Sequence, residues 1–203
     1  MKLVQRNIDT FSLGIVPVLN AFCGILRLRH SVQVGVLVLC FAFLGASNGF
    51  TQNINTSENF PDGDFRSVVE AFMGVGPGGA FTAEEAAQKG GVLDCSGLGI
   101  SDLSGIEYFT GISVLNCSNN VLTVLDVSQN GLLYSLLCQN NQLTSLDASN
   151  SRLLRYLYCH SNQLTDLAVP SSSNLLRLYC HNNQLTSLDL STQSSLTHLR
   201  CEN

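Results

Sequence analysis

The sequence has almost no lysine and no tryptophan, and little charge of either sign. Lys2 and Lys89 are its only lysines, and ten Lys and Arg stand against fifteen Asp and Glu, for a net charge of −5. This balance excludes the basic surface that nucleic-acid-binding proteins carry, so we expect no nucleic-acid partner. Charged residues make up only 12% of the chain and hydrophobic residues 45%, which excludes a disordered protein. A chain of 203 residues is expected to fold as one domain, or as one domain with an appendage.

A catalytic signature is also missing. We find no convincing Ser-His-Asp arrangement, phosphate-binding loop or paired carboxylates. Asp126, Asp147 and Asp189 occupy one position of a repeat, and Ala168 fills that position in another copy. These aspartates are therefore repeat consensus, and we expect neither enzyme activity nor a cofactor.

The cysteines reveal the repeat. Cys23 and Cys40 lie in an apolar N-terminal region, and the remaining six follow one another at gaps of 22, 21, 21, 21 and 21 residues. These six are Cys95, Cys117, Cys138, Cys159, Cys180 and Cys201. They occupy the template L-x-x-L-x-C-x-x-N-x-L, the leucine-rich-repeat consensus. The pattern predicts a leucine-rich-repeat solenoid over 90–203, with one short parallel strand per 21-residue coil and a mostly irregular or 3-10 convex side. We also expect this region to be truncated, without a C-terminal cap.

Each position of the repeat has a physical reason. Leu136 and Cys138 are two residues apart, so both point to one face of a strand, which we place in the coil interior. Leu143 and Leu146 return the chain through the core. An asparagine follows each strand, where its amide can bond backbone groups that would otherwise cost about 1–3 kcal/mol each. These asparagines are Asn120, Asn141, Asn162 and Asn183.

The repeated cysteines allow three interpretations. Stacked coils lie about 4.8 Å apart, a separation that a disulfide accepts. Parallel side chains are nevertheless poorly aimed for the disulfide dihedral of about 90°, and a free cysteine packs as a small hydrophobe. Zinc is disfavoured, because ligands one per coil form a line and not a tetrahedron. We therefore favour free, buried thiols and no metal.

A helical cap is predicted over 59–89. Phe65, Val68, Val69 and Phe72 share one helical face, with Asp64 as the expected N-cap. A glycine-rich stretch, 74–79, interrupts the helix. A second helix follows, with Thr82 and Glu85 in capping-box spacing. Helix, twelve-residue turn and helix outline a calcium-binding hand, but glycines stand at three ligand positions. We read the loop as a degenerate EF-hand without calcium.

The N-terminal region resembles an export signal. Residues 31–49 contain an uncharged apolar run that follows Arg27, Arg29 and His30 and ends in small residues. These are the parts of a signal peptide, and the run is too short to favour a membrane-spanning helix. A buried helix or strand is the alternative. Residues 1–30 form an extension of uncertain status, either a start assigned too early or part of a two-helix membrane anchor, and 50–58 is expected to be a linker. We expect a secreted or cell-surface protein without a stable membrane span.

The repeats resemble a known family. The segments L-T-S-L-D-x-S and L-x-C-x-N-N-Q-L are similar to those of bacterial internalin-like leucine-rich-repeat proteins, common among secreted proteins of the Bacteroidetes. Phe60-Pro-Asp-Gly-Asp-Phe65 and the segment 99–109 resemble the cap and first repeat of that group. The resemblance covers about residues 59–203. It implies an exported, curved solenoid that binds another macromolecule, without naming a partner.

In such solenoids the outward-facing strand residues line the concave surface. In the early coils these positions hold Val92, Asp94, Ser96, Val114, Asn116, Ser118, Ser135, Leu137 and Gln139. In the last three coils they hold Tyr156, Tyr158, His160, Arg177, Tyr179, His181, His198, Arg200 and Glu202. Tyr and Arg carry much of the binding energy at interfaces, so we predict a binding site at this second set, apart from Glu202. Stacking of Tyr158 on Tyr179 and of His160 on His181 is expected.

The residues of this predicted site also have roles that do not involve a partner. Aromatic ladders stabilise sheets, and duplication of a repeat copies residues without selection for binding. The histidines are alternatively metal ligands or groups that charge near pH 6.5. At the level of the whole chain we distinguish a binding module for a protein or glycan, a non-catalytic accessory fragment of a longer surface adhesin or secreted enzyme, and a structural spacer.

Overall fold

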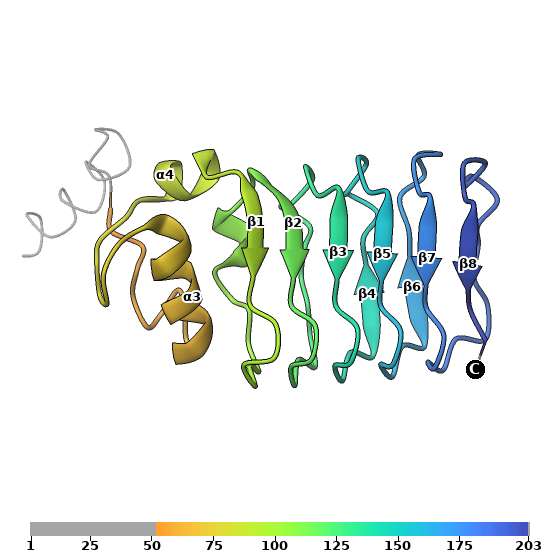
Figure 1. Cartoon of the computed structure of the whole chain (residues 1–203), viewed down its shortest axis with the longest axis horizontal. Helices are drawn as coiled ribbons and strands as arrows, with labels where there is room; N and C mark the ends of the chain where they lie inside the picture. Colours follow the sequence, from red (N-terminus) through yellow and green to blue (C-terminus); the bar gives the residue numbers. More distant parts are fainter. Residues whose placement is uncertain (1–51, 203) are drawn as a thin grey trace, which may run out of the picture. The chain divides into compact units, whose positions relative to one another are not determined.

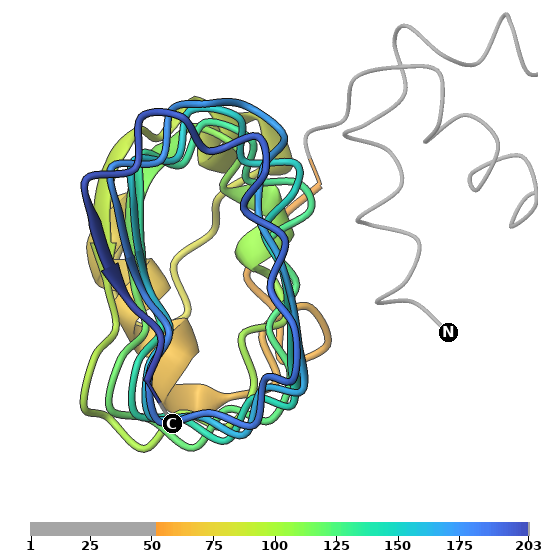
Figure 2. The same cartoon turned by 90° about the vertical axis from the view of Figure 1, so that its right-hand side faces the viewer.

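A computed structural model describes residues 52–202, which form a stack of coils closed at one end by a helical cap (Figure 1). The strands on one wall of the coils form a six-stranded parallel sheet in the order β1-β2-β3-β5-β7-β8. Their bounds are β1 Gly91–Asp94, β2 Ile112–Asn116, β3 Ser135–Leu137, β5 Tyr156–Tyr158, β7 Arg177–Tyr179 and β8 His198–Arg200. Seen from the end in Figure 2, successive coils lie one behind another. The predicted leucine-rich-repeat solenoid is confirmed.

The register between strands follows the 21-residue period. Leu136 pairs with Leu157, and Leu157 with Leu178, so equivalent leucines stack along the interior. The cysteine two residues further on points inward as predicted, and Cys95 to Cys180 are each 0% exposed. All six cysteines within 52–202 are free, and Cys201, in the last described coil, is exposed. The interior is therefore a continuous stack of leucines and thiols that no single coil buries alone.

The asparagine ladder takes the role predicted for it. Asn141 Nδ2 donates to the carbonyl oxygens of Cys117 (2.9 Å) and Cys138 (3.1 Å), and its Oδ1 accepts from the backbone N–H of Leu122 (3.0 Å). Asn162 repeats these bonds one coil later. Each side chain therefore satisfies backbone groups of its own coil and of the preceding coil.

The wall opposite the six-stranded sheet is built mainly of turns. It holds the 3-10 helix η2, Ile106–Tyr108, and two short parallel strands, β4 Ser145–Asp147 and β6 Asp166–Ala168, which pair in register. This second ladder was not anticipated. Leu146 and Leu167 point inward from it and are 2% and 7% exposed, so the core is closed from both walls.

The cap consists of helices α3, Gly63–Met73, and α4, Ala83–Gln88. The N-cap expected at Asp64 is wrong, because Asp62 caps the helix, which begins at Gly63, two residues earlier than expected. Asp62 Oδ1 accepts from the backbone N–H groups of Asp64 and Phe65, both at 3.1 Å. The capping box of Thr82 and Glu85 is confirmed, and α3 ends at Gly74 with φ +78°.

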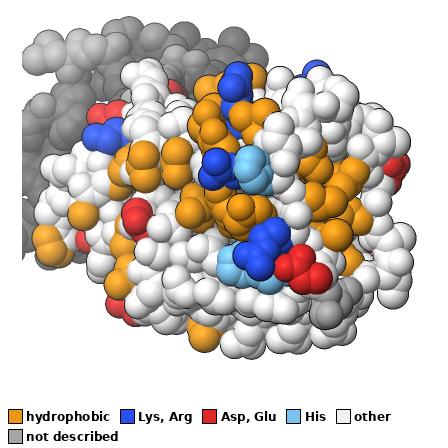
Figure 3. All heavy atoms as spheres, turned by 45° about the vertical axis from the view of Figure 1, so that its right-hand side comes forward, with side chains coloured by type: hydrophobic (Ala, Val, Ile, Leu, Met, Phe, Trp, Pro, Cys, Tyr) orange, Lys and Arg blue, Asp and Glu red, His pale blue; other side chains and the backbone are white. Residues whose placement is uncertain are grey.

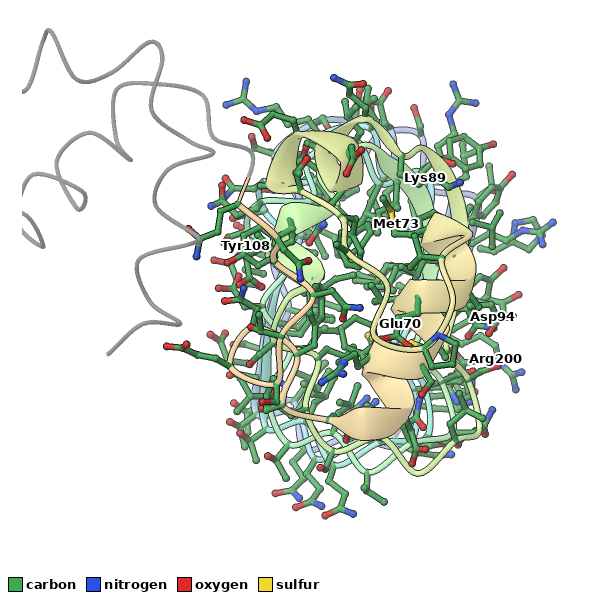
Figure 4. All side chains as sticks on the ribbon, turned by 90° about the vertical axis from the view of Figure 1, so that its left-hand side faces the viewer. Glu70, Met73, Lys89, Asp94, Tyr108 and Arg200 are labelled. Carbon is green, nitrogen blue, oxygen red and sulfur yellow. The ribbon has the colours of Figure 1, made fainter. Side chains whose placement is uncertain are left out.

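Phe60 is the centre of the cap's core. Its ring lies 6.1 Å from Phe65, 5.9 Å from Phe81 and 6.4 Å from Phe109, measured between centroids. Figure 4 shows Glu70 directed into the middle of the cap. Its Oε1 accepts from Asn55 Nδ2 and from the backbone N–H of Gly78, both at 2.8 Å. The glycine-rich loop is thus folded around a buried carboxylate.

Part of the predicted linker belongs to the cap. Asn53 forms an antiparallel bridge with Thr82, and Ile54 is 6% exposed. The predicted extension over 1–30 and the predicted signal peptide over 31–49 lie outside the described residues. Among residues 52–202, no helix is long and apolar enough to span a membrane.

Candidate binding surface on the six-stranded sheet

The candidate surface is the outward face of the six-stranded sheet, which we call the strand face. In Figure 4, viewed from the cap end, Asp94 and Arg200 project from the same side of the stack and Tyr108 lies on the other. β5, β7 and β8 bring together the predicted site residues, because each inward leucine is flanked by two outward side chains. The structure places Tyr156 opposite Arg177 and Tyr158 opposite Tyr179. It places Arg177 opposite His198 and Tyr179 opposite Arg200.

The early coils present a different face. Val92 is 58% exposed, and Asp94 accepts hydrogen bonds from the backbone and hydroxyl of Ser96. Ser118 and Ser135, expected to be open on this face, are buried at 3% and 9% exposure. Small polar side chains in these coils bond their own turns, so they offer less to a partner than the larger side chains of the last coils.

Both expected ring pairs are in contact, but only the histidine pair is stacked. The ring centroids of Tyr158 and Tyr179 are 5.0 Å apart, with the planes at 83°, so one ring presents its edge to the other. The imidazoles of His160 and His181 are 4.4 Å apart and nearly parallel, at 14°. Edge-to-face pairs are a favoured arrangement of aromatic rings, and these contacts hold the side chains in fixed positions.

Each arginine of this surface lies over a tyrosine of the preceding coil. The guanidinium carbons of Arg177 and Arg200 are 5.8 Å and 5.9 Å from the ring centroids of Tyr156 and Tyr179. Arg155 lies over Tyr134 at 5.6 Å in the same way, although neither residue was predicted as part of the site. The sequence contains a signal for these contacts, because the arginine and the tyrosine of each pair are 21 residues apart. Contacts of this kind fix the guanidinium over the ring. Arg200 Nε also donates to Glu202 Oε1 at 3.2 Å.

Two further exposed apolar residues lie close in sequence to this surface. Leu132 and Leu153 are 54% and 50% exposed, one coil apart in the turns that precede β3 and β5, and neighbouring Tyr134 is 40% exposed. Each of these leucines directly precedes the buried leucine that begins its repeat, so the sequence does not show which of the two is exposed. Figure 3 shows apolar side chains gathered beside arginines and histidines over this part of the molecule.

The histidines of the strand face differ in surroundings. Burial lowers the pKa of His160, and the neighbouring His181 and Arg200 lower it further, so the imidazole is predominantly neutral at pH 7. His198 is exposed and its Nδ1 lies 2.9 Å from Thr197 Oγ1. Within residues 52–202 no group of three His, Cys, Asp or Glu side chains is placed to hold a metal ion.

A groove lies on the opposite wall. The groove, of about 630 Å³, is lined by residues of the first two coils, including Asp102, Glu107 and Asp126. Each of these carboxylates accepts a backbone N–H of its own turn, from Ser104, Gly105 and Ser128. The carboxylates therefore serve the turns, and this groove lacks the convergent free groups of a binding site.

The thiols of the interior are chemically inert. Burial raises the pKa of Cys95 to about 12 and that of Cys180 to about 11. The fully buried thiols of Cys117 and Cys138 have pKa values raised well above the ordinary range, again by burial. Since the thiolate is the reactive form, the ladder is a packing element and not a redox site.

Comparison with known proteins finds relatives among the internalins, although no protein-family model matches the chain. It is 39% identical to internalin J of Listeria monocytogenes over 82 residues, which are 40% of this chain and 9% of that protein. The solved functional domain of InlJ, described as including a cysteine ladder, matches 71% of this chain at 40% identity with a TM-score of 0.68. That match covers 32% of the solved chain.

A more distant neighbour supports the fold alone. The internalin InlF of Listeria monocytogenes matches 73% of this chain and 52% of its own at 21% identity, with a TM-score of 0.58. The chain thus spans less than a tenth of the curated relative and about a third of the solved InlJ domain. These relatives come from Listeria, and the expected similarity to Bacteroidetes proteins stays a prediction.

Proposed function

Since this chain is an internalin-like leucine-rich-repeat protein, we propose that it is a non-catalytic module that binds a protein partner through the strand face of its last coils. Leucine-rich-repeat domains of the internalin type mediate protein–protein interaction, and nothing in the described residues assembles a catalytic group. The proposed site comprises Tyr156, Tyr158, His160, Arg177, Tyr179, His181, His198 and Arg200.

The observation that carries the proposal is the ordered set of tyrosines and arginines. Three Tyr–Arg contacts of 5.6–5.9 Å hold side chains in place before any partner arrives. Side chains fixed in advance lose little conformational entropy on binding, and Tyr and Arg are the types enriched among energetically dominant interface residues.

Sheet stabilisation alone accounts poorly for this set. The cross-strand pairs that stabilise a sheet are mainly aromatic, aromatic with β-branched, hydroxyl or opposite-charge pairs, and a Tyr–Arg pair is none of these. Here Arg155, Arg177 and Arg200 are exposed, and exposed charged side chains add little to stability.

Export is part of the same proposal. A protein of this type acts on partners at the cell surface or outside the cell, and the signal peptide predicted over 31–49 would deliver it there. N-terminal sequencing of the protein recovered from medium and membrane fractions tests this point. A mature N-terminus near residue 50 is expected, and recovery of the uncleaved chain in the cytoplasm contradicts it.

A second candidate function is an accessory region of a longer surface adhesin or secreted enzyme. It is favoured by the small share of internalin J that the chain matches, 9%. Sequencing the transcript that encodes this chain separates the two, because further repeats or a hydrolase domain joined to it would support the accessory role.

Binding to arrays of surface proteins and of glycans tests the main proposal. The full chain is compared with the triple variant Tyr156→Ala, Tyr158→Ala, Tyr179→Ala. A control triple, Thr144→Ala, Thr165→Ala, Thr186→Ala, changes exposed threonines one coil apart beside the opposite wall. We expect protein features that the parent and the control bind and the tyrosine variant does not.

Two other outcomes refute the proposal as stated. Tyrosine-dependent binding confined to glycans would make the chain a glycan-binding module. Binding that survives the tyrosine substitutions, in a variant whose circular dichroism matches the parent, would place recognition elsewhere on the chain.

A further inference from the structure

The charges of the chain are unevenly distributed over its surface. After position 51 the sequence holds fourteen acidic and six basic residues. Three of those six, Arg155, Arg177 and Arg200, lie over tyrosines of the strand face. Asp126, Asp147 and Asp189 of the repeats accept backbone N–H groups of the turns that follow them. The last coils therefore present a positive face on an otherwise acidic molecule.

Within residues 52–202, two of these arginines have no counter-ion. The ion pairs among the described residues are Arg66 with Glu70 and Arg200 with Glu202 at 3.2 Å. Arg155 and Arg177 thus have no carboxylate oxygen within 4.0 Å there. The guanidinium of Arg177 also hydrogen-bonds Tyr158. A guanidinium has five N–H donors, so each arginine keeps donors for a carboxylate.

The tyrosine rings offer less open surface than their number implies. Tyr134 contacts the ring of Tyr156 at 5.3 Å and carries Arg155 over its face. Tyr158 and Tyr179 contact each other, and the guanidinium of Arg200 lies over the ring of Tyr179. Stacking on a sugar requires an open ring face, so the chemistry presented outward is mainly the N–H and O–H donors. This disfavours a neutral glycan.

The exposed leucines call for an apolar group on the partner. Leu132 and Leu153 lie one coil apart and close in sequence to Tyr134 and Arg155, and both are about half exposed. Apolar contacts at the centre with charged contacts around them are typical of protein interfaces. A sulfated glycan would use the arginines and leave these leucines in water.

We infer that the strand face binds an acidic peptide segment that carries large apolar side chains, with its carboxylates on Arg155 and Arg177 and an apolar side chain against Leu132 and Leu153. The inference rests on the proposed function and specifies the chemistry of the partner. Carboxylates supply the charge complementarity that the two arginines lack within the chain, and the apolar residues restrict recognition to a peptide.

The test uses synthetic peptides and the full chain. The probe is a short peptide of Glu, Leu and Phe labelled with fluorescein. One counterpart has Gln for every Glu, and another has Ser for every Leu and Phe. Heparin serves as the sulfated glycan. Fluorescence anisotropy at low and high NaCl gives each affinity. We expect both counterpart peptides to bind about tenfold more weakly or worse, since each loses one of the two contact types.

Variants distinguish a site from general attraction. Arg155→Gln with Arg177→Gln is expected to weaken binding of the acidic peptide at least about tenfold. The double variant Leu132→Ser, Leu153→Ser should bind the peptide of Glu, Leu and Phe no more tightly than the counterpart with Ser for every Leu and Phe. Arg152→Gln is the matched control, because it removes the same kind of charge from an exposed turn before β5 and should leave binding unchanged.

The inference and the proposed function fail in different ways. Equal affinity for the acidic peptide and its Gln counterpart, or equal loss in the Arg152 control, overturns the inference. Heparin binding that depends on Arg155 and Arg177, without peptide binding, also overturns it. Partner proteins whose binding depends on the tyrosines can bind the arginine variant as well as the parent. In that case the proposed function stands and the inference falls. If no tyrosine-dependent partner exists, the proposed function itself fails.

Discussion

Replacing Asn141 by alanine tests the physical account of the repeat most directly. The substitution removes three hydrogen bonds, but it does not orphan three backbone groups. The carbonyl oxygen of Cys117 still accepts from Asn120 Nδ2, and that of Cys138 from Asn162 Nδ2. The backbone N–H of Leu122, which is 0% exposed, loses its acceptor and becomes the one unsatisfied buried group.

The expected cost follows from this inventory. An unsatisfied buried donor costs about 1–3 kcal/mol, and each lost amide bond contributes about 1 kcal/mol. We therefore expect Asn141→Ala to lower the free energy of unfolding by about 2–5 kcal/mol. The neighbouring exposed Gln142, changed to alanine, should cost less than about 0.5 kcal/mol.

Urea unfolding followed by circular dichroism and tyrosine fluorescence measures both effects, because the chain has no tryptophan. A second variant, Asn141→Asp, keeps the shape and the acceptor but directs an oxygen at two carbonyls. Those carbonyls raise the pKa of the new carboxyl in the folded state, so its destabilisation should grow as pH rises through the usual range of Asp. If Asn141→Ala lowers the free energy of unfolding no more than Gln142→Ala does, the asparagines do not satisfy the backbone groups that follow each strand, and the reasoning fails.

Three further predictions concern other parts of the chain. Of Cys95 to Cys201, only exposed Cys201 should react with iodoacetamide in the native protein, and peptide mass spectrometry that finds Cys138 modified without unfolding would contradict this. Glu70→Gln should cost about 1 kcal/mol at neutral pH. Hydrogen bonds, chiefly from Asn55, hold the pKa of Glu70 below its ordinary value of 4.5. The difference in free energy of unfolding between the parent and Glu70→Gln, measured by urea titration, should therefore shrink as pH falls below that value. Asn140 has φ +57°, so Asn140→Ala should be less stable than Asn140→Gly by about 1 kcal/mol, and equal midpoints would count against strain there.

The repeat was predictable because its causes are local and periodic. A residue such as Leu157 faces the interior for the same reason as Leu136 and Leu178, so one coil read correctly gives the register of the rest. The asparagine ladder and the free thiols follow from the same period. The strand pair β4–β6 was missed because Ser145–Asp147 has no sequence feature that separates a short strand from a turn.

The errors arose where distant residues decide local structure. Asp62 and Asp64 are both suitable caps by sequence, with one glycine between them. The structure selects Asp62 because its Oδ2 also accepts from the backbone N–H of Ser101, 39 residues away, at 2.9 Å. Glu70 is buried for a similar reason, since its partners Asn55 and Gly78 come from segments on either side of the helix. No periodicity reports such contacts.

The site was only partly predictable because strict alternation was assumed for its strands. Between Leu154 and Leu157, both of them buried, two consecutive residues point outward, so Arg155 joins Tyr156 on the surface. Applying the 21-residue spacing to outward positions, as it was applied to leucines, would have paired Arg155 with Tyr134. Leu132 and Leu153 required the structure, because leucine in a leucine-rich repeat is expected to be buried.

The division between inward and outward positions also accounts for how such a chain can acquire a partner without losing its fold. The inward positions hold leucine, cysteine and asparagine in coil after coil, and these residues satisfy the interior by themselves. The outward positions change from Val92 and Asp94 in the first coil to Arg177 and Tyr179 in β7 while the strands keep the same parallel pairing. The fold therefore does not require the Tyr–Arg contacts of the last coils, and the proposed binding role accounts for both their chemistry and their position.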